Sequence, residues 1–388
     1  MTYTIDHTKG KVVGAVSAQW ANRSPDQRFT SLTSLNKQVT QWANESRELE
    51  VKPEQIEAVY DEERPEWLGL NIDGQAIEAS NWSFDQIART AGAPANYLRT
   101  LPPALAATNI NYGLMAGEQK KISCYVRENG TTMLRGITST KYGRILDKDL
   151  AEAAIKIAGN GTGDTRWKVP GCIDWSNKHG VSYNPNVDIT KENTTLYASD
   201  RDIFVFLVDD MNPIEVGKLA NGDPDLMFRG FYAWNSEVGC RTFGYAQMYL
   251  RGVCQNRNLW GVEGFRQITF KHTSGAPDRF LKEAVPALNL FAEGSSTKLV
   301  SGVKAAKAKV VAKKEEDQIE FLQLQGFSEK SAKSLIATSE AEEGKPPMTL
   351  WDMAQAISAQ ARKEELQEAR LHMEQIAGKL LDRVKVDA

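Results

Sequence analysis

Basic and aromatic side chains alternate along one segment of the sequence, and this pattern points most directly to a chemistry. The alternating residues are Arg241, Phe243, Tyr245, Gln247, Tyr249 and Arg251. In an extended strand they would share one face, because successive side chains point to opposite faces. Aromatic rings stack on unpaired bases for ~1–3 kcal/mol each, and arginine neutralises phosphate. The segment therefore predicts a face that holds single-stranded nucleic acid without reading its sequence.

Further basic and aromatic residues could widen this face into a groove. They lie near the hairpin expected around residue 130, at the start of a later β-rich block, and just beyond the alternating segment. These residues are Arg135, Lys141, Arg144, Arg229, Trp234 and Arg257. Packing is the alternative, because tyrosines on strands are commonly half-buried and a helix over residues 245–256 would scatter the set. We expect binding from the set as a whole and packing for any single member.

Carboxylates suggest a second chemistry. Asp209, Asp210 and Glu237 could hold a divalent metal ion beside Lys271, an arrangement that suits phosphodiester cleavage. Adjacent aspartates after a strand are, however, more often a turn and a helix cap. The four histidines stand in unrelated contexts, without an H-E-x-x-H or G-x-S-x-G motif. Catalysis is therefore the lesser expectation, and no cofactor or resident metal is predicted.

Composition and charge restrict the classes of protein to which the chain can belong. It has 388 residues, 41% hydrophobic and 25% charged, which is typical of a globular protein rather than a disordered or collagen-like one. The net charge of −3 means that contact with a polyanion must come from local basic clusters. The longest apolar run, residues 203–208, is too short to span a membrane. With no apolar leader and four widely separated cysteines, we expect a cytoplasmic protein with reduced thiols.

The elements that must position these residues predict an α+β fold. Hairpins at residues 122–138, 194–210 and 228–270 are expected to form a central, mainly antiparallel sheet with helices over one side. Asn129-Gly130 predicts a type I′ turn, and residues 203–208, apolar on both faces, predict a central strand. We expect a helix over residues 147–158 and, after Thr349, a final helix of about thirty-five residues.

Changes in composition suggest four parts. They are an N-terminal extension with one helix (1–60), an α+β core (61–296), a lysine-rich linker or helix (297–318) and a helical C-terminal region (319–388). The lysines between residues 298 and 314 could clamp phosphate, but a solvated helix is the better interpretation.

Four stretches of the sequence resemble a known family. They are residues 87–102 (IARTAGAPANYLRTLP), residues 137–142 (ITSTKY), residues 234–239 (WNSEVG) together with 251–256 (RGVCQN), and residues 350–354 (LWDMA). In this order they resemble the phage/plasmid-like family described as domain of unknown function 932. The resemblance implies a protein carried by phages, plasmids or conjugative elements, often near genes of DNA metabolism, and it implies no activity. The chain departs from the family in having Trp-Asn-Ser-Glu where Ser-Asn-Ser-Glu is expected.

Taken together, these features predict a nucleic-acid-binding protein of a mobile element. We expect it to bind or anneal single-stranded DNA without catalysis, as a homo-oligomer and with no membrane contact. One alternative is a metal-dependent nuclease built on the carboxylates above. The other is an interaction protein that modulates a host defence or regulatory system, with the long C-terminal helix as its docking face.

Overall fold

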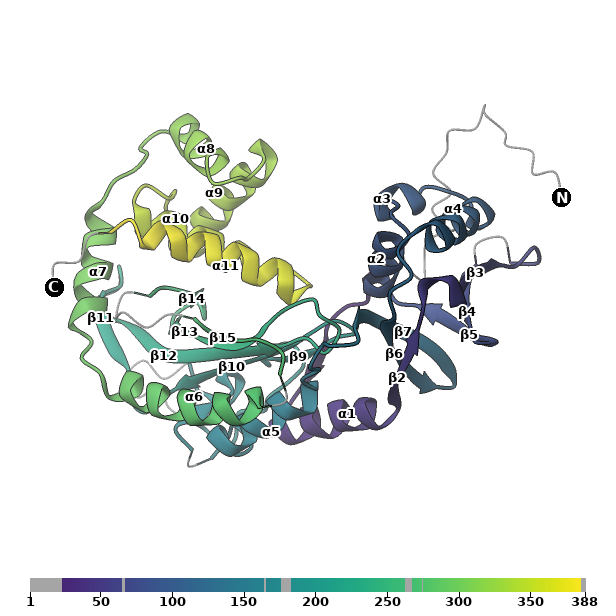
Figure 1. Ribbon diagram of the computed structural model, residues 1–388. Coiled ribbons are helices and arrows are strands. Elements are labelled where there is room, and N and C mark those ends of the chain that lie inside the picture. The colour runs from purple at the N-terminus through teal and green to yellow at the C-terminus, as the bar shows by residue number, and fades with distance from the viewer. Residues whose placement is uncertain are drawn as a thin grey trace.

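Two β-sheets and the helices packed on them make up the protein, and the fold is α+β as predicted (Figure 1). The computed structural model describes residues 23–64, 67–163, 165–175, 183–261, 267–273 and 275–384. Among the described strands every pairing is antiparallel except that of β5 (Gln75–Ala79) with β7 (Thr131–Ser139). The prediction of mainly antiparallel sheet is therefore confirmed.

The smaller sheet has the strand order β2-β6-β7-β5-β4-β3 and a core of its own. Its other strands are β2 (Ser46–Val51), β3 (Ile56–Tyr60), β4 (Leu68–Ile72) and β6 (Ile122–Asn129). Three helices accompany it, namely α2 (Asn81–Thr90), α3 (Ala95–Leu98) and α4 (Pro103–Ala116). Ile77 of the sheet, Phe84 of α2 and Ile110 of α4 belong to one buried cluster, so the helices close one side of this sheet.

The larger sheet has the order β1-β9-β10-β12-β13-β14, with β8, β11 and β15 paired to β10, β12 and β13. Its strands are β1 (Gln27–Phe29), β8 (Trp167–Lys168), β9 (Leu196–Ala198), β10 (Ile203–Asp209), β11 (Ile214–Lys218), β12 (Pro224–Asn235), β13 (Phe243–Arg251), β14 (Arg257–Asn258) and β15 (Ile268–Phe270). Every residue of β10 is buried, which confirms the central strand expected at residues 203–208.

Helices lie on both faces of the larger sheet. On the lower face in Figure 1 lie α1 (Leu32–Asn44), α5 (Asp147–Ala158) and α6 (Ala276–Glu293). Across the opposite face runs α11 (Gln367–Leu381), whose Leu371 packs into the cluster that holds Phe206 and Tyr232. The helix expected over residues 147–158 has the predicted bounds.

The C-terminal region is helical, but the single long helix expected after Thr349 is wrong. The chain forms α7 (Thr297–Ala308), α8 (Glu315–Gln323), α9 (Glu329–Glu343), α10 (Leu350–Ala361) and then, after a turn, α11. The turn, residues 362–366, contains no glycine or proline that would predict it from the sequence. Where the turn ends, the Gln367 N–H donates to Asp26 Oδ2 at 2.6 Å, and these two residues are 341 positions apart in the sequence. Folding back lets both α10 and α11 bury apolar residues, which a straight helix would leave exposed.

The N-terminal and lysine-rich segments are integrated into the fold. Of residues 1–60, the described part gives β1 and α1 to the larger sheet and β2 and β3 to the smaller one. In the lysine-rich segment, α7 buries Leu299 and Val303 and exposes Lys298 and Lys304. This one-sided burial is that of a solvated helix on the body of the protein.

Two tight turns illustrate what local sequence determines. Asp73 and Gly74, with φ of 51° and 81°, form the left-handed pair of a two-residue hairpin between β4 and β5. The hairpin at Gly130 is also present, but there only Gly130 has a positive φ, of 74°, and Asn129 pairs with Thr131. The hairpin prediction is confirmed, whereas the type I′ turn predicted for it is wrong.

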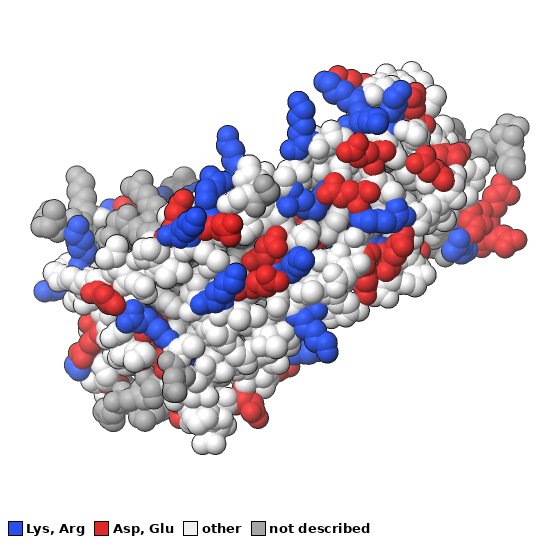
Figure 2. Space-filling view, turned by 60° about the horizontal axis from the view of Figure 1, so that its bottom comes forward, with Lys and Arg blue, Asp and Glu red and all other residues white. Residues whose placement is uncertain are grey.

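Charges on the face seen in Figure 2, where the bottom of Figure 1 comes forward, are mixed. Lysines and arginines are interspersed with aspartates and glutamates across this view. A polyanion would meet repulsion as well as attraction there, so this face does not favour binding of a polyanion. Within the described ranges, each helix is too short or too polar to cross a bilayer.

Candidate functional site

The segment that alternates basic and aromatic residues is a strand, β13, but its rings lie in the core. Phe243, Tyr245 and Tyr249 are fully buried under α6. Ring centroids are 5.3 Å apart for Tyr245 and Phe280, and 5.6 Å apart for Tyr249 and Phe291. Alternation decides which side chains share a face, but not whether another element covers that face. These rings are therefore not available to stack on bases.

The predicted basic residues mostly hold the fold together. Buried guanidinium groups need acidic or carbonyl partners, because an uncompensated buried charge is costly. The ion pairs are Arg135 with Glu237, Arg144 with Glu48, Arg241 with Asp202 and Arg251 with Asp225. Arg229 is buried and donates to the Gly294 carbonyl, Trp234 is buried beside Tyr232, and Lys141 is exposed. These side chains do not line a common groove.

The carboxylates proposed for a nuclease lie at opposite ends of the larger sheet. Asp209 ends β10, whereas Glu237 follows Asn235, which pairs with Ile203 at the start of β10. Six residues of strand, about 20 Å, separate those ends. Asp210 is paired with Lys168 at 2.5 Å, and Lys271 is exposed. Among the described residues no group of three His, Cys, Asp or Glu is placed to hold a metal ion, so the predicted cluster does not form.

Glu237 instead belongs to a buried cluster between the two sheets. It forms an ion pair with Arg135 of β7, and its Oε2 accepts from the Asp147 N–H at 3.2 Å. Asn235 donates to Asp147 Oδ1 at 2.8 Å. Arg135, Asp147 and Glu237 are all nearly inaccessible to solvent. Burial, and then the charge of Glu237, raise the pKa of Asp147 well above its usual value, which favours the protonated form of Asp147 beside the Arg135–Glu237 pair.

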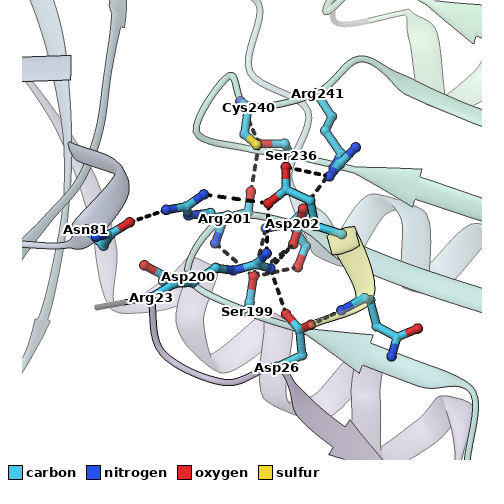
Figure 3. A network of polar contacts seen from close by, with 12 residues as sticks. Arg23, Asp26, Asn81, Ser199, Asp200, Arg201, Asp202, Ser236, Cys240 and Arg241 are labelled. Atoms are coloured by element: carbon cyan, nitrogen blue, oxygen red, sulfur yellow. Dashed lines mark hydrogen bonds and ion pairs between the residues drawn. The ribbon is translucent and has the colours of Figure 1, made fainter. Parts of the chain in front are cut away.

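A second charged network joins four parts of the chain (Figure 3). Arg23 contacts Asp26 at 2.8 Å, Asp202 at 3.2 Å and Glu368 at 2.8 Å. Arg241 contacts Asp202 at 2.8 Å and Glu368 at 3.0 Å. These residues come from the segment before β1, the β9–β10 turn, the loop just before β13 and the first turn of α11. The network therefore fixes the beginning of α11 on the larger sheet.

Beside this network lies a cavity of about 450 Å³, between the larger sheet and the α10–α11 turn. Four arginines line it, namely Arg28, Arg257, Arg362 and Arg370, and we call it the arginine cavity. Tyr197, Met248 and Leu250 contribute ring and apolar surface to its wall. The cavity thus combines cationic groups with an apolar wall, which is the composition of a site for an amphipathic anion.

Arg257 is the most constrained of the four arginines. It is 1% exposed and stacks on Phe206, with its Cζ 3.7 Å from the ring centroid. Its Nε donates to Glu374 at 2.8 Å and its Nη2 to Gln367 at 3.0 Å. Within the described part of the chain, its Nη1 has no hydrogen-bond partner. Burial, and then the charge of Arg370, lower the pKa of Arg257 to about 10, so the group stays charged at neutral pH.

Arginines outnumber acids among the described residues that line the cavity. The acids among these described lining residues are Glu192 and Glu364, and Arg362 is also paired with Glu342 at 2.5 Å. Glu374 is shared by two of the arginines, because it also accepts from Arg370 Nε at 2.8 Å. Arg28 Nη1 donates to the backbone carbonyl of Lys191 at 3.0 Å, a neutral partner. An anion would gain charge-assisted hydrogen bonds here.

Sequence reasoning had named one of these four arginines, Arg257, for a different reason. Arg28, Arg362 and Arg370 were missed because they reach the cavity only after the chain turns back at residue 362 and β1 pairs with β9. Both events are long-range, and no local motif marks them.

Comparisons with protein-family models, curated proteins and solved structures found no match. The resemblance to a phage/plasmid-like family stays a prediction.

Proposed function

We propose that the protein binds single-stranded nucleic acid without catalysis, and that it does so at the arginine cavity rather than along β13. The observation that carries the proposal is Arg257, a buried cation that lines a ligand-sized cavity and whose Nη1 has no hydrogen-bond partner among the described residues. A buried donor left without a partner costs about 1–3 kcal/mol, so a phosphate oxygen that accepts from it recovers that cost on binding. Arginine also matches phosphate geometry, because its guanidinium offers paired donors.

The size and wall of the cavity favour one unpaired nucleotide at a time. Its volume of about 450 Å³ lies within the usual range for small-ligand sites and is far below what a duplex would need. Tyr197, Met248 and Leu250 offer a surface for a base, while the arginines face phosphate. Base stacking and phosphate pairing are the two contacts by which proteins hold single strands without reading sequence.

Binding of a fluorescent thymidine 20-mer, followed by anisotropy at low salt, tests this proposal. Arg370→Gln is expected to weaken binding about tenfold or more, because a hydrogen bond to a charged group contributes ~1.5–3 kcal/mol. Arg257→Met should weaken it further, and urea unfolding will check that each variant is folded.

Arg279→Gln is the matched control, since Arg279 is exposed on α6. Its replacement changes the net charge by the same amount as Arg370→Gln. It should bind like the wild type. No binding by the folded wild type at low salt, or equal losses in Arg370→Gln and Arg279→Gln, would contradict the proposal.

A further inference from the structure

Residues 23–29, which we call the strap, run along the edge of the larger sheet and reach the start of α11. Two of their side chains contact the first residues of that helix. Asp26 Oδ2 accepts from the Gln367 N–H at 2.6 Å, and Arg23 Nη1 lies 2.8 Å from Glu368 Oε2. The sequence separations are 341 and 345 residues, so these contacts depend wholly on the fold.

The strap is anchored to the sheet at its other side. Arg23 also contacts Asp202 in the β9–β10 turn at 3.2 Å, and β1, which ends the strap, pairs with β9 from Gln27 to Phe29. The side chains of Arg23 and Asp26 are 8% and 2% exposed. Such burial makes the strap part of the packed body and a rigid support for α11.

Helix α11 depends on this support because it has no side-chain cap of its own. Its N-cap residue is Leu366, whose side chain cannot accept a hydrogen bond from the first turn. The first N–H groups of a helix need acceptors, and negative charge there is favourable. Asp26 supplies a carboxyl acceptor to the Gln367 N–H. It therefore caps α11 from near the N-terminal end of the described residues.

Gln367 connects the strap to the arginine cavity. Its backbone N–H bonds Asp26, while its side-chain Oε1 accepts from Arg257 Nη2 at 3.0 Å. Arg370 follows one turn later on the same helix and also lines the cavity, as does Arg28 of the strap. Release of the strap would therefore move two cavity arginines and remove a partner from a third.

We infer that the strap positions the arginine cavity: its contacts with the first turn of α11 hold the arginines in place for phosphate. This inference rests on the proposed function for the identity of the ligand. Strap engagement and ligand binding are then coupled, so each favours the other by the same factor.

Hydrogen exchange of the amides of residues 367–371, measured on the full chain without ligand, tests the strap directly. Asp26→Ala is expected to speed exchange about five- to tenfold, the range that loss of a helix cap produces. Arg23→Gln should have a similar but smaller effect. Asp61→Ala is the control, since Asp61 pairs with Arg64 in an exposed turn away from α11. Unchanged exchange in Asp26→Ala would overturn the inference.

Affinity for the thymidine 20-mer tests the coupling. Asp26→Ala should weaken binding, because Arg28 and Arg370 lose part of their support, and saturating oligonucleotide should slow exchange at residues 367–371 of the wild type. Faster exchange with unchanged affinity would overturn the positioning role and leave the proposed function intact. Faster exchange with no oligonucleotide binding by the wild type would instead contradict the proposed function.

Discussion

The buried cluster of Arg135, Asp147 and Glu237 makes a prediction that can be worked out in detail. One guanidinium faces two carboxyl groups, and all three side chains are out of contact with water. The pKa of Asp147 is raised by burial and by the charge of Glu237, so we expect Asp147 to be the acid that holds a proton. Replacing Asp147 by Asn therefore substitutes one neutral group for another in the folded protein. Because the unfolded aspartate loses its proton near its ordinary pKa, the variant should match the wild type only at low pH and be the more stable protein at pH 7.

Replacing Glu237 by Gln removes the Arg135–Glu237 ion pair, but Asp147 remains as an acid beside Arg135. Asp147 can then ionise beside Arg135, so the expected cost is that of one poorer buried hydrogen bond, about 1–3 kcal/mol. The double variant Asp147→Asn/Glu237→Gln leaves Arg135 uncompensated. Its cost should reach about 3–5 kcal/mol, the usual loss when one partner of a buried pair is removed.

Urea unfolding of the four proteins, followed by tryptophan fluorescence, measures this cycle. The double variant should lose more stability than the two single variants together, because each acid substitutes for the other. Additive losses would refute the assignment of one proton to this cluster.

The pH dependence of the same proteins gives a second test of the cluster. Because the pKa of Asp147 is higher in the folded protein than in the unfolded chain, its contribution is fully present below the unfolded pKa. That contribution is lost as pH rises through the folded pKa. The wild type should thus lose stability relative to Asp147→Asn as pH rises through that region. A constant difference between the two proteins would contradict the raised pKa.

Two further predictions concern the packing that positions the site. Tyr249→Ala should cost about 3–5 kcal/mol in urea unfolding, as for other buried aromatic residues, whereas a loss below about 0.5 kcal/mol would mean that this ring is exposed after all. Gly378→Ala should destabilise the protein by about 1–3 kcal/mol and weaken oligonucleotide binding, because an added Cβ would lie 2.1 Å from the Leu259 carbonyl oxygen and push α11 off the sheet. An unchanged midpoint and affinity for this variant would show that α11 does not rest on β14.

Local patterns in the sequence predicted the elements well where short-range forces dominate. The alternation at residues 241–251 gave a strand, the apolar run at 203–208 gave a central strand, and the periodic residues of 147–158 gave a helix. Each of these depends on side-chain spacing within one element.

Long-range packing decided the features that the sequence did not reveal. The rings of β13 became core because α6, which begins twenty-five residues after β13, covers them. The expected C-terminal helix is interrupted between α10 and α11, where Asp26 caps the Gln367 N–H. The arginine cavity forms only where β1, β14 and α11 meet, so three of its four arginines carried no signal in the sequence.

The salt dependence of oligonucleotide binding tests the central claim most directly. On single strands, each phosphate neutralised by the protein contributes about 0.7 to the slope of log affinity against log salt. We expect a negative slope for the wild type, reduced in magnitude by about 0.7 in Arg370→Gln and unchanged in Arg279→Gln. The same slope in all three proteins would show that phosphate does not bind in the arginine cavity.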